Sequence, residues 1–333
     1  MKQTLLLILT IFLVSCDGNL NRIGRQQLGT LVNVTFIGDA EAASRTARAV
    51  FDEIERIESL MSPHRPGSDL DRLNRDGGSG AVVVSAETYD LIKKSAAISA
   101  ESGGCFDITV AALDHLWDYR SKRFYPPPRS AVALLLPVVN SKYITFYPDR
   151  KGIAYARNGM KIGLGAIAKG YAVERGIIAL KEKGVRHGIV EAGGDLQVIG
   201  SKFGRPWITG LRHPRKDALL AAISLDDMDA VATSGDYERF VMHNGVRYHH
   251  IIDPRTGYPA NTFASVTVIS KNPVLSDAYA TALFVMGLDA AREFLKRHDE
   301  IDVILADKNV NFYVSRRLKD RISLLDQVKV EWL

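Results

Sequence analysis

The sequence predicts an α+β fold. Stretches with the 3.6-residue apolar spacing of amphipathic helices occur beside stretches with the two-residue alternation of strands. The two kinds do not alternate regularly, as they would in a doubly wound parallel sheet. The 333 residues are 46% hydrophobic and 24% charged, which is typical of a soluble globular protein with a large core. No internal repeat or low-complexity segment is evident.

The first half of the chain predicts strands and helices of ordinary length. The strongest signals are the β-rich alternation over 30–37 and the helical spacing over 40–60. Three consecutive prolines, Pro126 to Pro128, predict a loop. In order, the expected elements are a strand over 30–37, a helix over 40–60, a loop with a short helix over 62–74, a strand over 82–84, a helix over 87–101, a loop over 121–129 and a hairpin over 145–156.

The second half opens on a glycine-bearing loop over 163–170, which feeds a helix that ends near residue 184. Gly193 and Gly194 interrupt the next strand. In order, the further elements expected are a strand over 188–199, strands within 207–224, strands over 247–252 and 265–270, a helix over 276–297, a strand over 301–306 and a short strand pair from residue 311.

Residues 1–16 depart from the globular pattern. Lys2 precedes an apolar run over 5–14 that is too short to span a membrane, and the run ends in a lipobox-like Leu-Val-Ser-Cys. We expect a signal peptide over 1–16, lipidation (palmitate) at Cys16, a tether over 17–27 and a single functional domain over 28–333. Asp17 resembles the signal that keeps a lipoprotein in the inner membrane, on its periplasmic side. An ordinary signal peptide or a disordered tail remains the alternative.

Charge and cysteine content limit the possible partners. The net charge is +5, but the basic residues are scattered and form no stripe with interleaved aromatic residues, so we expect no nucleic-acid partner. A mildly cationic surface suits an anionic substrate, or simply solubility. Acylation of Cys16 would leave Cys105 as the remaining thiol, which excludes an intrachain disulfide and a cysteine-based zinc site.

The loop over 163–170 is the first candidate binding motif. Glycines allow a ligand to approach the backbone, and the helix that follows offers free N–H groups and a positive dipole end. Lys169 adds a positive charge. The motif predicts a pyrophosphate cradle or, alternatively, only a tight strand-to-helix turn.

The second motif is the pair Asp277 and Thr281. Ser276 is expected to cap a helix whose first turn holds Asp277, and residues four apart lie on one helix face. A carboxylate and a hydroxyl are hard oxygen ligands that suit Mg²⁺. The alternative is that Asp277 complements the helix dipole and Thr281 bonds to the helix backbone.

The third motif is the pair His249 and His250, which precedes a turn over 253–257. Neighbouring residues on a strand point to opposite faces, so one imidazole could serve as a general base in a cleft. A strand-edge histidine bonded to a carbonyl is the alternative. The segments over 102–107, 191–195 and 233–237 are glycine turns with polar groups, and each is nonspecific alone.

Together these segments resemble the FAD:protein FMN transferase (ApbE) family, in the family's order, from about Leu28 to Leu288. The matching segments are 28–30, 61–74, 103–107, 164–172, 192–195, 233–239, 250–257 and 277–281.

The resemblance implies an α+β fold with a T-fold-like core of mixed sheet and helices, and FAD held in a cleft. It implies that Mg²⁺ is bound by Asp277, Thr281 and the carbonyl of Ala166, and that His250 and Lys169 are catalytic. The residues implied to contact the flavin or its diphosphate are Leu28, His64, Cys105, Phe106, Asp107, Lys169 and Ile252. Two positions depart from the family pattern. Gly163 lies in the cofactor-binding segment where Asp is frequent, and His64 stands where some relatives carry a flavin-facing tyrosine.

The implied reaction is Mg²⁺-dependent transfer of FMN from FAD to a threonine hydroxyl of an acceptor protein, with release of AMP. The implied acceptors are exported flavoprotein redox subunits with a Ser/Thr-Gly-Ala-Thr-like motif. Two alternatives remain open: an Mg²⁺-dependent FAD pyrophosphatase that releases FMN and AMP, and a non-catalytic flavin-binding lipoprotein. An iron–sulfur role is disfavoured, because one mature thiol cannot hold a cluster.

Overall fold

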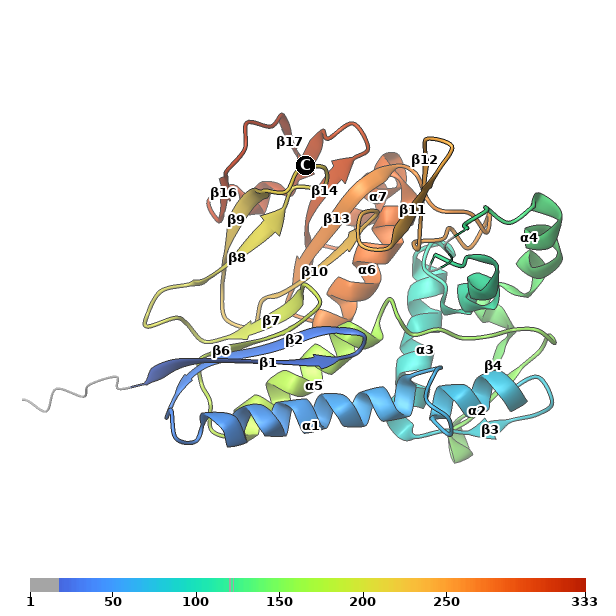
Figure 1. Ribbon diagram of the computed structural model, residues 1–333, viewed down its shortest axis with the longest axis horizontal. Coiled ribbons are helices and arrows are strands. Elements are labelled where there is room, and N and C mark those ends of the chain that lie inside the picture. Colours follow the sequence, from blue (N-terminus) through green and yellow to red (C-terminus); the bar gives the residue numbers. More distant parts are fainter. Residues whose placement is uncertain (1–17, 120, 122) are drawn as a thin grey trace, which may run out of the picture.

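The computed structural model describes residues 18–119, 121 and 123–333, and its backbone confirms the α+β class (Figure 1). The predicted signal peptide, with Cys16, lies outside the described residues. A nine-stranded sheet runs through this part of the chain. Its strands pair antiparallel except for the parallel pair at one end. In spatial order they are β1 (Asn19–Gln27), β2 (Thr30–Gly38), β6 (Gly188–Ala192), β7 (Asp195–Ile199), β10 (Ala230–Gly235), β13 (Phe263–Ser270), β14 (Asp302–Asp307), β15 (Phe312–Val314) and β17 (Val330–Trp332).

Three helices cover one face of this sheet: α1 (Ala43–Met61), α5 (Ala168–Glu182) and α6 (Pro273–Met286). In Figure 1, α1 and α5 lie side by side beneath the strands. Their close approach depends on Gly176, where a Cβ would lie 2.9 Å from Val190 Cγ1 and 3.2 Å from Val50 Cγ1. Apolar residues of α1 at helical spacing, Val50, Ile54 and Ile57, are fully buried here.

A second sheet covers the opposite face. It consists of β8 (Trp207–Arg212), β9 (Leu219–Leu225) and β16 (Ile322–Leu324), and it encloses a separate apolar core against the main sheet. Because both faces of the main sheet are covered, β13 is buried along its whole length. Val266 packs on the helix side and Ile269 on the side of the second sheet.

The remaining elements surround these layers. The helices are α2 (Asp69–Asp76), α3 (Ala86–Glu101), α4 (Arg129–Leu135) and α7 (Leu288–Leu295). The short 3₁₀ helices are η1 (Ile108–Leu116), η2 (Leu136–Val138), η3 (Ser141–Tyr143), η4 (Pro148–Arg150) and η5 (Arg316–Leu318). Helices α2, α3 and α4 lie at the right of Figure 1, whereas α7 lies beside α6 and η5 belongs to the apolar core under the second sheet. The strands are β3 (Val82–Val83), β4 (Ile144–Tyr147) and β5 (Gly152–Tyr155), which form one sheet, and the hairpin of β11 (Phe240–His243) and β12 (Val246–His249).

Three expectations differ from the structure. The predicted tether includes β1, an edge strand whose side chains are mostly exposed, so it lacks the apolar alternation that would have revealed it. The predicted helix over 276–297 is two helices, because Gly287 adopts φ 79° between α6 and α7. Residues 233–235, predicted as part of a turn, belong to β10.

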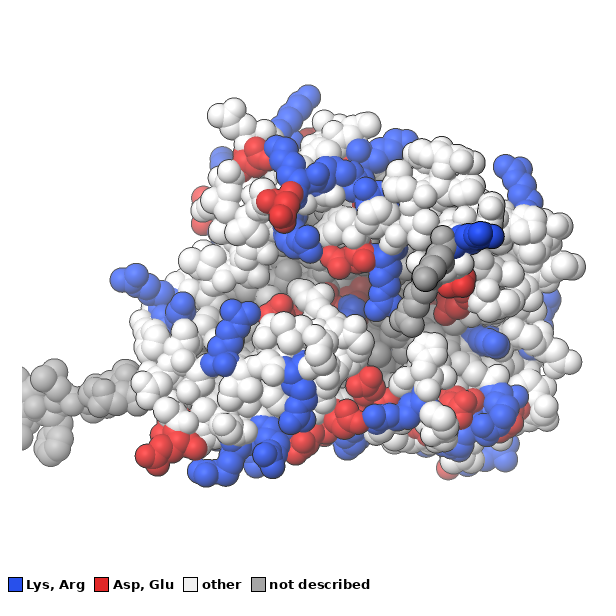
Figure 2. Space-filling model, in the orientation of Figure 1, with Lys and Arg blue, Asp and Glu red and all other residues white. Residues whose placement is uncertain are grey.

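The surface carries charges of both signs. On the face seen in Figure 2, Lys and Arg alternate with Asp and Glu along the lower rim, where α1 and α2 lie. Within the described part of the chain, no helix combines the length and the apolar content needed to cross a membrane.

Candidate functional site

The centre of the candidate site is the junction of α5 and α6. The amide of Gly170 donates to Asp277 Oδ2 at 3.0 Å. A Cβ at Gly170 would lie 2.2 Å from the Pro273 carbonyl oxygen. Only glycine therefore lets the two helices come this close. The predicted glycine loop and the predicted Asp277–Thr281 pair thus meet at one place.

The start of α6 differs from the prediction. Asn272, not Ser276, caps the helix, since its Oδ1 accepts from the Leu275 amide at 3.0 Å, and Pro273 follows at the first helical position. Ser276 lies inside the helix, with its hydroxyl 2.8 Å from Ser270 Oγ. Asp277 is therefore in the second turn, and its carboxylate interacts with α5 rather than with its own helix end.

Lys169 lies between two buried carboxylates. Its ammonium donates to Asp277 Oδ1 at 3.1 Å and also to Asp195 Oδ2. Burial opposes the charge of Lys169, but the two carboxylates outweigh this effect and raise the pKa of its ammonium. Burial also raises the pKa of Asp195, and Lys169 offsets this only in part. Two carboxylates share one ammonium, so the cluster has a surplus of negative charge when Asp195 is ionised, and in that state it suits a further cation.

Oxygen atoms suited to Mg²⁺ surround this cluster. The Thr281 hydroxyl lies one turn after Asp277 and 3.1 Å from Ser234 Oγ. The Gly170 amide, which has no acceptor within its own helix at this position in the first turn of α5, donates to Asp277, and no backbone amide of the described residues donates to the Ala166 carbonyl. A carboxylate, a hydroxyl and a free carbonyl match the chemistry of a magnesium site. No group of three or more His, Cys, Asp or Glu side chains in the described ranges could hold a metal ion. Of the three predicted Mg²⁺ ligands, Asp277 is the one that belongs to these four residue types.

The two predicted histidines point to opposite sides, as expected. His249 is buried, its Nε2 lies 2.6 Å from the Ala260 carbonyl oxygen, and its Nδ1 accepts from the Ile251 amide at 3.3 Å. His250 reaches solvent, with Nδ1 3.4 Å from the Arg239 carbonyl oxygen. The protein atoms around its ring, and next the Arg239 cation, lower the pKa of His250 to about 4. A neutral imidazole at neutral pH is what a general base requires.

The segment after α3 is held rigidly. Gly103 and Gly104 adopt φ 63° and 79° and end the helix, and Cys105 and Phe106 are buried in the main core. Asp107 is engaged within the protein: Oδ1 accepts from the Thr109 amide and hydroxyl at 2.9 and 2.6 Å, and Oδ2 from Ser99 Oγ at 3.0 Å and the Ser141 amide at 2.8 Å. The Asp107 carboxylate therefore stabilises the loop.

The other predicted flavin contacts lie on loops at several places. The Leu28 amide, in the β1–β2 turn, donates to Glu58 Oε2 at 3.0 Å. His64 is exposed between α1 and α2, and Ile252 is buried in an aromatic cluster beside Trp117. A Cβ at Gly163 would lie 2.9 Å from Ala111 Cβ, so a side chain at this position would require its surroundings to shift.

Sequence reasoning missed two members of the cluster. Asp195 follows the Gly193–Gly194 turn of the β6–β7 hairpin, and Ser234 lies on β10. Both belong to glycine segments that were singled out as polar turns but not connected to Lys169 or Thr281. The contact depends on strand order: β7 and β10 are neighbours, and the Thr233 amide donates to Asp195 Oδ1 at 3.3 Å.

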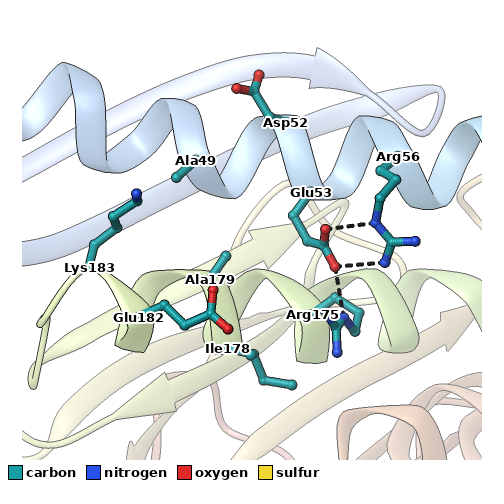
Figure 3. A pocket seen from close by; sticks show the side chains of 9 residues that line it. All are labelled: Ala49, Asp52, Glu53, Arg56, Arg175, Ile178, Ala179, Glu182 and Lys183. Carbon is teal, nitrogen blue, oxygen red and sulfur yellow. Dashed lines mark hydrogen bonds and ion pairs between the residues drawn. The ribbon is translucent and has the colours of Figure 1, made fainter.

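A groove of about 350 Å³ between α1 and α5 contains none of the predicted site residues (Figure 3). Three of the charged side chains that line it are paired: Glu53 accepts from Arg56 Nε and from Arg175 Nε, each at 2.8 Å. Hydrogen bonds to Arg56 lower the pKa of Glu53 to about 2 despite partial burial. This groove is a helix–helix interface in which Glu53 pairs with both arginines.

Comparison with known proteins points to one family. The model of the ApbE family matches residues 28–305. The FAD:protein FMN transferase of Treponema pallidum is 31% identical, over 94% of this chain and 92% of that protein. The one from Klebsiella pneumoniae is also 31% identical, over 84% and 88%.

Solved structures agree with this assignment. The ApbE protein of Thermotoga maritima superposes with a TM-score of 0.83 at 35% identity and covers 91% of this chain and 99% of that one. The flavin transferase ApbE of Vibrio cholerae gives a TM-score of 0.82 at 26% identity, with the same coverage. The chain is therefore an enzyme of the ApbE family, the family of FAD:protein FMN transferases.

Proposed function

We propose that this enzyme transfers FMN from FAD to a threonine hydroxyl of an acceptor protein, with Mg²⁺ bound at the α5–α6 junction and AMP as the second product. The observation that carries the proposal is the cluster of Lys169, Asp277 and Thr281, joined by the amide of Gly170. The T. pallidum and K. pneumoniae relatives named for this activity span most of the chain, which supports the choice of substrate.

The reaction exchanges the phosphoanhydride bond of FAD for a phosphoester bond to the acceptor threonine. The acceptor oxygen attacks the FMN phosphorus, the bond from that phosphorus to the oxygen shared with AMP breaks, and AMP leaves with that oxygen. Such a displacement requires in-line positioning and neutralisation of charge more than covalent catalysis. Lys169 supplies positive charge on the first turn of α5.

His250 is suited to take the proton of the acceptor hydroxyl. In the tautomer that donates from Nδ1 to the Arg239 carbonyl, Nε2 keeps its lone pair. The Tyr119 hydroxyl donates to the carbonyl of His249 at 2.7 Å and fixes the backbone beside the base. Negative charge from bound FAD would raise the pKa of His250 above its value in the free enzyme and make it a stronger base.

Asp277, Thr281 and the Ala166 carbonyl would hold Mg²⁺, which supplies Lewis-acid neutralisation of the diphosphate when bound. The residues proposed to line the flavin part of the site are Leu28, His64, Cys105, Phe106 and Ile252. In this role His64 would stack on a flat ring with less area than a tyrosine offers.

Incubation of the enzyme with FAD, Mg²⁺ and a candidate acceptor tests the function. Flavin fluorescence on the denatured acceptor band is expected. Free FMN and AMP without a labelled acceptor would instead identify an FAD pyrophosphatase, and bound FAD without turnover would identify a flavin carrier. The proposed acceptors are exported redox subunits with a Ser/Thr-Gly-Ala-Thr-like segment.

The proposed location is the periplasmic side of the inner membrane, with a lipid on Cys16. β1 begins at Asn19, so residues 17 and 18 alone separate the proposed anchor from the folded domain. Such a short spacer would keep the active site near the membrane and favour membrane-bound acceptors. A Cys16→Ser variant is expected to leave the membrane fraction, and its retention there would contradict the lipid anchor.

A further inference from the structure

Lys169 bridges Asp195 and Asp277, and the proposed transfer does not by itself require this arrangement. Asp277 Oδ2 accepts from the Gly170 amide, so Oδ1 is the oxygen that faces the cluster, and Lys169 Nζ lies 3.1 Å from it. A divalent ion that binds Asp277 Oδ1 would therefore compete with the Lys169 ammonium for the same oxygen atom. Two cations cannot share one carboxylate oxygen at these distances without strong repulsion.

Asp195 offers Lys169 a second partner. Its side chain is 4% exposed, accepts from Lys169 and is held by the Thr233 amide at 3.3 Å. The Lys169 side chain is 31% exposed, so it has room to turn, whereas Asp195 is fixed at the β6–β7 turn. The ammonium can therefore leave Asp277 and stay paired.

We propose that Lys169 is a tethered cation that occupies the Asp277 carboxylate in the metal-free enzyme, and that Asp195 is a positioning residue that retains Lys169 when a divalent ion takes its place. This inference takes one point from the proposed function, namely that Asp277 is a metal ligand. It assigns Asp195 a part in metal loading rather than in contact with FAD.

Formal charges at the cluster predict how variants rank. With both carboxylates ionised, Asp195, Asp277 and Lys169 together carry −1 in the wild type, and the titration is run above pH 7 because the pKa of Asp195 is raised to about 7. The variants carry −2 in Lys169→Met, 0 in Asp195→Asn and −1 in the double variant. One unit charge within about 4–6 Å commonly changes an ionic equilibrium on the order of tenfold. Divalent-ion affinity should therefore be tightest in Lys169→Met, weaker and nearly equal in the wild type and the double variant, and weakest in Asp195→Asn.

The test is a titration of the full chain with Mn²⁺ in the absence of FAD and acceptor. Electron paramagnetic resonance measures the bound and free Mn²⁺ and so gives the affinity of each variant. The expected result is roughly tenfold tighter binding in Lys169→Met and roughly tenfold weaker binding in Asp195→Asn. Lys271→Met is the matched control, because Lys271 lies 2.8 Å from the buried Asp229, which keeps Arg321 as a partner. Its Mn²⁺ affinity should equal that of the wild type.

Equal or weaker binding in Lys169→Met would overturn the proposal, because a lysine that only supports the fold gives no gain in affinity when removed. If Lys169→Met does not fold, the remaining variants decide, since the double variant must bind Mn²⁺ more tightly than Asp195→Asn. FMN transfer by the wild type is measured separately. An intact affinity order without transfer refutes the proposed function alone, and transfer without that order refutes this inference alone.

Discussion

The Gly170 amide and the Asp277 carboxylate are joined by a 3.0 Å hydrogen bond that ties the first turn of α5 to the second turn of α6. The bond exists because Gly170 has no Cβ, and the backbone of Pro273 occupies the space in which one would lie. This contact turns Asp277 away from its own helix and toward Lys169, so the chemistry of the site depends on one close approach between two helices.

Gly170→Ala should separate α5 from α6. Its Cβ would meet the Pro273 carbonyl oxygen at 2.2 Å, so backbone must shift, and we expect a loss of about 1–3 kcal/mol in the free energy of unfolding. Unfolding in denaturant measures this change in the free energy of unfolding. Gly80→Ala is the control, because nothing lies within 4 Å of a Cβ there. Equal stability of the two variants would show that the junction tolerates a side chain.

Asp277→Ala should abolish FMN attachment, since it removes the carboxylate that accepts from Gly170 and Lys169 and would bind Mg²⁺. We expect a loss of at least roughly 100-fold in the transfer rate, measured by in-gel flavin fluorescence of the acceptor. Circular dichroism confirms that the variant is folded. Full activity in a folded Asp277→Ala enzyme would refute the metal assignment.

Thr281→Val removes a hydroxyl and keeps the shape of the side chain. If Thr281 is a metal ligand, the Mg²⁺ concentration for half-maximal transfer should rise roughly tenfold, while Thr281→Ser should restore it. The lost contact to Ser234 Oγ, at 3.1 Å, is a weak neutral bond that affects stability more than the metal requirement. An unchanged Mg²⁺ requirement in Thr281→Val would exclude the hydroxyl as a ligand.

The pH dependence of kcat/KM tests His250 as the base. The pKa of His250 is about 4, so the ring is neutral in the free enzyme above about pH 5 and gains a proton as the pH falls through 4. The rate should be flat from about pH 8 to 5 and decline below that, whereas an ordinary histidine would give a decline near 6.5. His250→Gln should lower the rate roughly 100-fold or more and remove the decline. An unchanged rate and profile in that variant would count against the base.

Asp107→Asn separates a structural role from a flavin contact. The new amide would place an NH₂ against the Ser141 amide or the Thr109 amide, each of which now donates to the carboxylate. An unsatisfied buried donor costs about 1–3 kcal/mol, so the melting temperature should fall while the KM for FAD stays near the wild-type value. A raised KM for FAD at an unchanged melting temperature would instead support the flavin contact that the resemblance predicts for Asp107.

Local periodicity alone predicted much of the site. Because residues four apart share a helix face, the sequence placed Asp277 and Thr281 together, and because neighbours on a strand diverge, it separated His249 from His250. Glycines marked the loop before α5 and the β6–β7 turn correctly. Two features were missed: β1 is mostly polar on both faces, and the cap of α6 is Asn272 rather than Ser276.

By itself, then, the sequence determined the fold class and the local spacing of the reactive groups, because backbone geometry repeats every 3.6 or 2 residues. Only the tertiary structure decided that Lys169 meets Asp195, 26 residues away, and Asp277, 108 residues away. Those contacts depend on the order of strands in the main sheet and on the packing of α5 against α6. Neither is encoded in a short window, since each results from burial of two faces of one sheet by segments distant along the chain.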